Sequence, residues 1–598
     1  MMFFGKKEYR NPWSWVPSLY FAEGIPYVVV MTVSVILYKR LGLSNTEIAL
    51  YTSWLYLPWV IKPLWSPFVD IFRTKRWWIV IMQLIVGAGL AGVAFTIPTS
   101  NFVQYTLAFF WLLAFSSATH DIAADGFYMI GLSEHDQTFF VGIRSTFYRI
   151  AMIVGQGILI IIAGYFETTT GLQPVDLTLH SKPNTEIVNN PAPSELTFKR
   201  NALQQSLYIN SVSTNISTNK NNKFALDSAL QYVQKWNFDH GFYGKNAEPH
   251  KIQPLSESDK TVEVGNFALL YISLNQSPEE GTEQVVTLDR ESGDKSFNLL
   301  EGTRFVFNSS NWDKPALALV QIDHRLRTVS SALFQARSGD IPKAWSYTFF
   351  LITALFLGFF LYHKFILPYP QSDKPVLAGG SAKSIFQEFF KTFALFFTKE
   401  KIWLVITFLL IYRFGEAQLV KLASPFLLDP RSAGGLELTT GQVGFVYGTV
   451  GIIGLTLGGL LGGFVAAKDG LKKWLWWMFM AINIPHVLYI YLAYAQPDHF
   501  IIINACVFGE QFGYGFGFTA YMLYMIYVSQ GTHKTAHFAI TTGFMALSMM
   551  IPGMISGWIQ EQIGYQLFFV WILLTMIPGF FIVRMLNIDP EFGKKKKE

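Results

Sequence analysis

The sequence predicts an all-α polytopic membrane protein of twelve transmembrane helices, with a mainly β domain inserted between the fifth and the sixth. Two observations support this fold class. Only 15% of the 598 residues are charged and 51% are hydrophobic, whereas soluble domains are about one quarter charged. In addition, apolar runs of membrane-spanning length, roughly 20 residues, recur on both sides of one long polar stretch.

The apolar runs set the positions of the helices and the division of the chain. We expect helices near 14–37, 47–66, 77–97, 103–131, 139–165, 345–364, 402–426, 442–466, 474–495, 500–528, 537–560 and 566–587. The expected domains are an N-terminal half at 1–166, the insert at 167–343, helix 6 at 344–364, a cytoplasmic linker at 365–400, a C-terminal half at 401–590 and a basic tail at 591–598.

Short basic clusters between the helices predict the orientation. Arg10 and its neighbours precede helix 1, RTKR (73–76) joins helices 2 and 3, KDGLKK (468–473) joins helices 8 and 9, and KKKK (594–597) ends the chain. With twelve crossings, all of them fall on one side. By the positive-inside rule this side is the cytoplasm, with both termini in it. No cleaved signal peptide is expected, because the first residues lack a small-residue cleavage site.

The insert is a polar stretch of about 177 residues without an apolar run long enough to cross a bilayer. We therefore expect an extracytoplasmic domain. FALDSALQYVQKW (224–236) predicts an amphipathic helix. Later apolar or alternating segments between turn residues predict strands; they lie at 264–274, 283–290, 303–310 and 316–323. The segment 299–323 resembles the end of a bacterial Ig-like or Calx-β-like sandwich repeat, in which an F-x-x-x-NW turn joins the last two strands.

Ionisable side chains inside the predicted helices are functional candidates, because each costs about 2.5 kcal/mol or more at mid-bilayer. The candidates for proton coupling are Asp121, Asp125, Glu23, Glu416 and Glu510. The candidates for binding a solute are Lys62, Arg144, Arg149, Arg413, His120 and Tyr27.

Asp121 and Asp125 are four residues apart and therefore share one helical face. Two close carboxylates in a low dielectric resist ionising together, which suits a proton carrier, and Arg144 and Arg149 could neutralise the remaining charge. Two alternatives stay open: the aspartates only pin two helices together through arginine pairs, or they are hydrated near the cytoplasmic surface. His120, about 100° away on the helix, is interpreted mainly as a hydrogen-bonding packing residue.

Other polar positions allow two interpretations each. Arg413 and Glu416 are three residues apart and are expected to pair on one face, either for transport or as a static ion pair. Lys62 is expected to anchor a solute or to pair with Asp121 or Glu23, because an unpaired buried lysine is costly.

The glycines of GEQFGYGFGF (509–518) favour close helix packing, which does not need the Glu510 within that run. Pro26 is expected to break helix 1 near mid-membrane, as in the broken helices of transporters.

Two loops at equivalent places in the two halves resemble the G-x-x-x-D-R-x-G-R-K signature of the major facilitator superfamily. In SPFVDIFRTKRWW (66–78), Asp70, Arg73 and Arg76 keep the sense of the signature. In GGFVAAKDGLKK (462–473), Ala467 stands where the acid should be. Six helices, a linker and six more helices are also the plan of that superfamily. The resemblance implies that these loops brace the cytoplasmic gate.

Seven further motifs resemble, in the right order, the muropeptide permease (AmpG-type) family, a branch of that superfamily which also holds the acetyl-CoA transporters. They are YFAEGIPY (20–27), IKPLWSPFVD (61–70), SATHDIAADG (117–126), the YR of STFYRIAM (145–152), YRFGEA (412–417), GEQFGYGFGFTAY (509–521) and AHFAITTG (536–543). The likeness covers roughly 1–165 and 345–590.

The resemblance implies proton-coupled import of a cell-wall breakdown product across a bacterial inner membrane, with the insert in the periplasm. The typical substrate of the family is N-acetylglucosaminyl-anhydro-N-acetylmuramyl peptide. By motif, the polar positions of the family match Lys62, Asp121, Asp125, Arg149, Glu416 and Glu510. Two features depart from the family: Glu23 stands where members often have a small residue, and the insert is absent from the common form.

The sequence contains no nucleotide-binding loop, multi-cysteine cluster or convincing nucleophile set. We therefore expect no enzyme activity, no cofactor, no metal and no nucleic-acid partner. The expected partners are the lipid bilayer, protons and a small solute, with a periplasmic protein or peptidoglycan for the insert, and the membrane unit is expected to be monomeric. Two alternatives remain: a carrier or exporter of another anionic or amphiphilic solute, and a non-transporting scaffold whose insert binds envelope partners.

Overall fold

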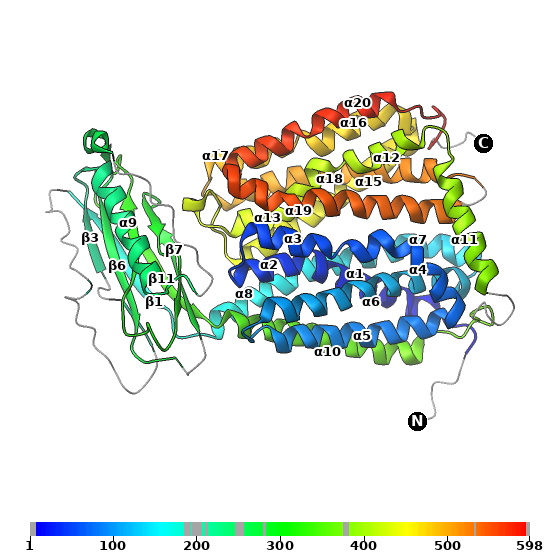
Figure 1. Ribbon diagram of the computed structural model, residues 1–598, viewed down its shortest axis with the longest axis horizontal. Helices are drawn as coiled ribbons and strands as arrows, with labels where there is room; N and C mark the ends of the chain where they lie inside the picture. Colours follow the sequence, from blue (N-terminus) through cyan, green and yellow to red (C-terminus); the bar gives the residue numbers. More distant parts are fainter. Residues whose placement is uncertain are drawn as a thin grey trace. The chain divides into compact units, whose positions relative to one another are not determined.

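The computed structural model describes residues 7–183, 193, 206–209, 213–244, 256–278, 283–374, 382–531 and 534–593. The basic tail KKKK (594–597) lies outside these residues. The chain divides into two compact units (Figure 1). One is helical and joins Met1–Gly164 to Trp345–Glu598, and the other, Tyr165–Ala344, contains the strands.

The helical unit is mostly a bundle of long apolar helices. In its first half these are α1 (Val16–Val28), α2 (Ser34–Arg40), α3 (Asn45–Trp54), α4 (Leu57–Phe72), α5 (Lys75–Thr96), α6 (Phe102–Gly131), α7 (Glu134–Ile153), α8 (Leu159–Thr169) and α10 (Ile341–Ile366). The second half holds α12 (Ile402–Ile411), α13 (Phe414–Leu428), α14 (Thr440–Val443), α15 (Ile452–Asp469), α16 (Leu471–Asn483), α17 (His486–Ala495), α18 (Phe500–Ser529), α19 (Lys534–Leu574) and α20 (Met576–Met585).

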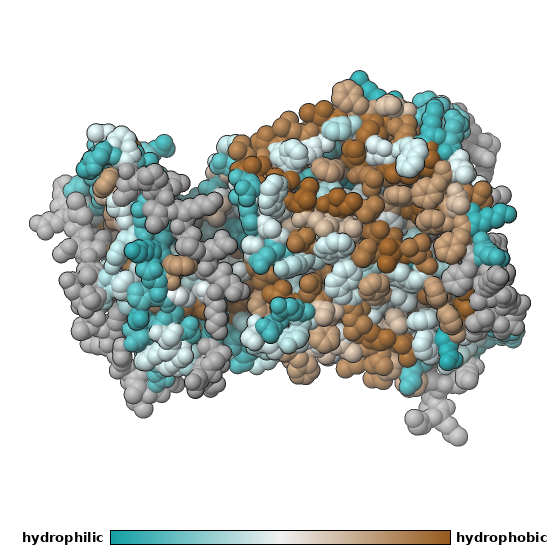
Figure 2. Space-filling view, viewed as in Figure 1, coloured by the Kyte–Doolittle hydropathy of each residue, from teal (hydrophilic) through white to brown (hydrophobic). Residues whose placement is uncertain are grey.

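Nine helical runs among the described residues are long and apolar enough to cross a membrane. Large apolar side chains cover the outside of this unit, as the brown surface in Figure 2 shows. Phe95, Trp403 and Phe464 are among the exposed ones. In water such a surface would be costly, so the helical unit has the surface of a membrane protein.

Pro26 does not break the first helix, contrary to expectation. It lies in the last turns of α1, and the chain continues through a π-helical segment, Val29–Val33, into α2. Proline lacks an N–H and its ring crowds the carbonyl four residues earlier. The wider π-helical segment that follows lets the helical run continue.

The linker between the halves contains a helix that the sequence analysis did not identify. α11 (Ala382–Phe397) follows the Pro/Gly-rich part of the linker. Its Phe396 packs edge-on against His537 and stacks on Phe544 of α19. Aromatic packing at the end of α11 thus ties this part of the linker to the second half.

The strands of the second unit form two packed sheets, with a separate short pair made by β4 (Asn221–Asn222) and β5 (Glu263–Val264). The five-stranded sheet has the order β3 (Ser213–Ser217), β1 (Val175–Lys182), β11 (Ser330–Gly339), β7 (Gln284–Gly293) and β9 (Arg304–Phe307). The four-stranded sheet has the order β2 (Leu207–Ile209), β6 (Phe267–Leu274), β10 (Ala316–Ile322) and β8 (Phe297–Glu301).

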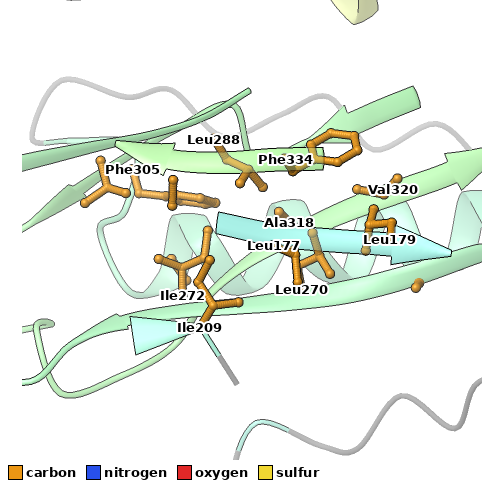
Figure 3. Close-up of a cluster of buried hydrophobic side chains, with 14 of the residues drawn as sticks. Leu177, Leu179, Ile209, Leu270, Ile272, Leu288, Phe305, Ala318, Val320 and Phe334 are labelled. Atoms are coloured by element: carbon orange, nitrogen blue, oxygen red, sulfur yellow. The ribbon is translucent and has the colours of Figure 1, made fainter. Parts of the chain in front are cut away.

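Alternation along the strands builds the core between the two sheets. Leu177 and Leu179 of β1 meet Leu270 and Ile272 of β6 in one buried cluster (Figure 3). The other face of the four-stranded sheet is covered by α9 (Lys223–Asp239), the helix expected at 224–236. The insert therefore has a sandwich core, with one helix over one of its faces.

The expected turn lies one strand earlier than the sequence resemblance placed it. The residues FNSSNW (307–312) connect β9 to β10, and β11 follows as a further strand. β11 pairs antiparallel with β1 at the other end of the insert sequence. The sequence analysis missed β11, which also pairs antiparallel with β7.

Candidate transport site

Three carboxyl groups come together in the first half of the bundle. Glu23 of α1 and Asp121 and Asp125 of α6 place one carboxylate oxygen each within 4.8 Å of one another. The i, i+4 spacing on α6 accounts for the two aspartates, and the packing of α1 on α6 adds Glu23.

Lys62 of α4 forms an ion pair with Asp121 Oδ2. Of the two interpretations of Lys62, pairing with an acid is therefore what this structure contains. The side chains keep 25% and 22% of their surface exposed, respectively. The pair therefore remains in contact with solvent.

Arg144 of α7 pairs with the second aspartate. Its Nη2 lies 3.1 Å from Asp125 Oδ1, and its Nη1 donates to the Tyr20 hydroxyl at 3.0 Å. Tyr20 in turn donates to Asp125 Oδ1 at 3.1 Å. Arg149, which was expected beside the same acids, instead lies against Gly459 of α15 in the other half.

The cluster therefore has three acids and two cations. Glu23 is only 8% exposed, and its Oε2 has no hydrogen-bond partner among the described residues. Asp125 is the most exposed member, with 44% of its side chain exposed. Because Lys62 and Arg144 already engage the aspartates, the set suits a proton on its third carboxyl group better than a metal ion.

His120 belongs to a separate hydrogen-bonded chain. Its Nε2 accepts from Gln83 Nε2 at 3.0 Å, and Gln83 Oε1 lies 3.0 Å from His363 Nδ1. His363 Nε2 accepts from the Ser18 hydroxyl at 2.9 Å. This chain joins α5, α6, α10 and α1, which fits the interpretation of His120 as a packing residue.

Arg413 does not form an ion pair with Glu416 in the described structure, contrary to expectation. The helix is interrupted here: α12 ends at Ile411, α13 begins at Phe414, and Arg413 has non-helical angles of φ −111° and ψ 17°. The i, i+3 rule therefore does not apply. Arg413 donates to the Tyr514 hydroxyl, and its guanidinium lies 4.6 Å from the ring centre of Phe518.

Glu416 and Glu510 lie next to each other in the second half. Both are 1% exposed, and each has one carboxylate oxygen without a hydrogen-bond partner among the described residues. The other oxygens accept from His486 Nε2 at 3.2 Å and from Gln511 Nε2 at 3.0 Å. Two such neighbours cannot both be charged without a large cost.

Tyr27 of α1 lies within electrostatic reach of charged groups in both halves. Its ring packs edge-on against Trp59, with the ring centres 5.3 Å apart. Asp121 of the first half and Arg413 of the second both interact with its hydroxyl group.

The loop expected to brace the cytoplasmic gate contacts the linker between the halves. The backbone N–H groups of Lys75 and Arg76 donate to Asp373 at 2.7 and 3.0 Å. The Arg76 guanidinium stacks on Tyr369 at 3.8 Å, and that of Arg73 lies 5.7 Å from the ring centre of Trp77. The side chain of Asp70 lies outside the described residues.

A polar network joins the two halves at one end of the bundle. Lys39 of α2 pairs with Asp429, just after α13, at 2.6 Å. Tyr565 of α19 donates to the same carboxylate at 2.6 Å, and Asn45 of α3 donates to Gln560 of α19 at 2.7 Å. We call these five residues the end network.

One site residue, His486, had no sequence signal of its own. It lies in an apolar run, where a single polar side chain is not distinctive. A search for isolated histidines near the membrane acids would have found it only with knowledge of which helices pack together.

Known bacterial proteins are similar to parts of this chain. The model of the BT1 family matches residues 23–175. The anhydromuropeptide permease of Escherichia coli is 23% identical over 277 residues, or 46% of this chain and 54% of that protein. Putative transporter AmpG 1 of Rickettsia bellii is 27% identical over 183 residues, or 30% of this chain and 42% of that one. The chain thus spans about half the length of the curated relatives it matches.

Solved transporter structures share the fold at low sequence identity. The nucleoside transporter NupG aligns with a TM-score of 0.52 and 10% identity, covering 96% of this chain and 98% of that one. The D-xylose-proton symporter aligns with a TM-score of 0.51 and 9% identity, covering 98% and 99%.

The bundle and its apolar outer surface are those of a polytopic membrane protein, and its fold is the fold of these solved transporters. In sequence the chain is similar to AmpG-type proteins over part of their length, and its residues 23–175 match the BT1 family model.

Proposed function

We propose that this protein is a proton-coupled secondary transporter that imports muropeptide or anhydro-muramyl cell-wall fragments across a bacterial inner membrane. The observation that carries the proton coupling is the set of three carboxyl groups against two cations in the first half. Among the described residues Glu23 is the buried acid of this cluster without an ion pair, and its neighbour is the Asp121 carboxyl group. A buried carboxylate without a cation beside it is strongly disfavoured.

The proposal includes twelve crossings with both termini in the cytoplasm. The run His537–Met585 is interrupted at Gly564, where φ is 73°, so it is long enough for two crossings. With the basic loops on the cytoplasmic side, the insert is periplasmic, and the end network lies at the periplasmic end. Closure at that end would leave the central site facing the cytoplasm.

In this scheme Glu23 carries the coupled proton. Asp125 is the most exposed member of the cluster and lies beside it, so it offers a path for the proton between water and the buried carboxyl. Protonation of Glu23 balances the cluster, because Lys62 and Arg144 already match the two aspartates. A neutral cluster can be enclosed at lower cost than a charged one.

The proposed solute is an anionic sugar-peptide. The anhydromuropeptide permease of Escherichia coli is a distant relative. The residues between the halves also suit such a solute, because Arg413 can hold a carboxylate and aromatic rings such as Tyr27 and Trp59 suit sugar faces.

Uptake of a labelled anhydro-muropeptide into proteoliposomes tests the proposal. Accumulation should follow an outward-acidic gradient and vanish under an inward-acidic one. Asp125→Asn should lose most of the gradient-driven uptake, because it removes the most exposed carboxylate. Glu400→Gln, which removes an exposed acid between α11 and α12, is the matched control and should behave like the parent.

Folded protein without gradient-dependent uptake would count against this solute. The preferred hypothesis would then be transport of another anionic or amphiphilic solute, or a scaffold whose insert binds envelope partners.

A further inference from the structure

A buried lysine lies between the two halves without a carboxylate to pair with among the described residues. Lys421 of α13 is 1% exposed. Its Nζ donates to the Thr52 hydroxyl of α3 at 3.1 Å and lies 5.0 Å from the ring centre of Tyr56. A hydroxyl and a ring compensate only part of the cost of burying an ammonium group.

A second polar atom beside Lys421 is also unsatisfied. Ser53 of α3 is 0% exposed, and its Oγ has no hydrogen-bond partner among the described residues. A Cβ added to Gly553 of α19 would lie 2.6 Å from Ser53 Oγ and 3.5 Å from Lys421 Cε. The end of the Lys421 side chain and the Ser53 hydroxyl therefore both lie next to Gly553, where a larger residue would not fit.

The three elements that make this site belong to both halves. α3 packs against α19 and α13 here, and the end network closes the same end of the bundle, with Lys39 of α2 held to Asp429. Separation of the halves at this end would remove Thr52 from Lys421 and expose the ammonium group. Lys62 and Arg144 differ, because aspartates already neutralise them.

We infer that Lys421, together with Ser53, is a binding site for a carboxylate group of the transported solute, reached from the end of the bundle that the end network closes. An ammonium group and a hydroxyl are donors that suit a carboxylate. The site rests on the proposed transport function, and it assigns the first contact of an anionic solute to the second half rather than to the acid-rich first half.

Transport kinetics with two probes test the site. The probes are an anhydro-muropeptide and the same compound with its carboxylates converted to amides. Lys421→Gln should raise KM for the acid form roughly 10- to 100-fold, the range for a lost hydrogen bond between charged groups. It should leave kcat and the KM of the amide form within about twofold of the parent.

Two further variants separate binding from folding. Lys421→Arg keeps the charge and should restore much of the affinity for the acid form. Lys473→Gln removes an exposed lysine paired with Asp469 and should change neither KM. An equal rise in KM for both probes, or a loss confined to kcat, would overturn the inference.

A labelling experiment does not depend on the solute. Lys421→Cys in a Cys506→Ser background should react with a membrane-impermeant thiol reagent added on the periplasmic side, and the acid probe should protect it. Absence of labelling in the folded protein would overturn the site. Labelling without any muropeptide transport by the parent would instead reject the proposed solute and keep the site.

Discussion

The acids inside the two halves of the bundle differ in their exposure and in their pairing with cations. In the first half, Asp121 and Asp125 are paired with cations, and these side chains stay 22–44% exposed. In the second half, Glu416 and Glu510 lie side by side at 1% exposure, and the nearby Arg413 is occupied by aromatic rings.

This difference separates two roles for a buried carboxyl group. An acid that exchanges protons needs contact with water, which the first half provides through Asp125. Glu416 and Glu510 are enclosed and have no such contact. We therefore propose proton exchange in the first half and solute contact in the second.

Breaking the ion pair of the first half should have the largest effect. Lys62→Ala leaves the Asp121 carboxylate without its cation, and breaking a buried pair costs about 3–5 kcal/mol. Because this pair is partly hydrated, we expect about 2–3 kcal/mol and a loss of transport of roughly 100-fold or more. Thermal unfolding in detergent and proteoliposome uptake are the measurements.

The double variant Lys62→Ala/Asp121→Ala is the control for that prediction. It should regain most of the stability, because no unpaired charge remains, but not the transport. Full transport by the double variant would show that the pair only braces α4 against α6.

Substituting the arginine of the second half sharpens the comparison. Arg413→Lys keeps the charge but loses the planar stacking on Phe518 and Tyr514, worth about 1–2 kcal/mol when desolvated. We expect a roughly 5- to 30-fold loss of solute affinity. Arg144→Lys, whose ion pair with Asp125 a lysine can keep, should lose less. Equal losses in binding measurements of the two variants would remove this distinction between the halves.

Weakening the contact between the halves should have a smaller effect, an increase in the population of molecules whose halves are open at this end. Asp429→Asn removes the carboxylate that holds Lys39 and accepts from Tyr565. Because the pair is partly exposed, we expect about 1 kcal/mol, or roughly fivefold more of the open population. Hydrogen exchange at the start of α3 should speed up accordingly; unchanged exchange would mean that the end network does not hold the halves together.

The smallest expected effect is on the stability of the insert, at Asp294. The Ser330 hydroxyl and the Ser296 N–H donate to Asp294 and lower the pKa of its carboxyl. A lowered pKa means that the carboxylate stabilises the fold above its unfolded-state pKa of about 3.9. That contribution disappears as the pH falls through the lower folded-state value.

Asp294→Asn should therefore destabilise the insert at pH 7 by less than about 1 kcal/mol, since the residue is only partly buried, and the effect should be smaller near pH 3. Hydrogen exchange of the β7 and β11 amides in the full chain, corrected for the intrinsic pH dependence, measures this. A destabilisation of equal size at both pH values would contradict a lowered pKa of Asp294 in the folded state.

Local patterns in the sequence predicted the elements better than their contacts. The apolar runs predicted the long helices, and the i, i+4 spacing placed Asp121 and Asp125 on one face. The meeting of Glu23 with these acids depends on how α1 packs on α6 and was not predicted. The expected pair of Arg413 with Glu416 was wrong because the helix is interrupted between α12 and α13, which no composition signal marked.

Comparing net accumulation with exchange tests the central claim most directly. Proteoliposomes containing the parent, Glu23→Gln or Glu510→Gln would be assayed for uptake driven by an outward-acidic gradient and for counterflow at equal pH. We predict that Glu23→Gln keeps counterflow but loses accumulation, because only net transport needs the proton to leave. Glu510→Gln should keep both, since glutamine imitates a carboxyl that already holds its proton. Accumulation that survives Glu23→Gln but is lost in Glu510→Gln would contradict the account and place the proton in the second half.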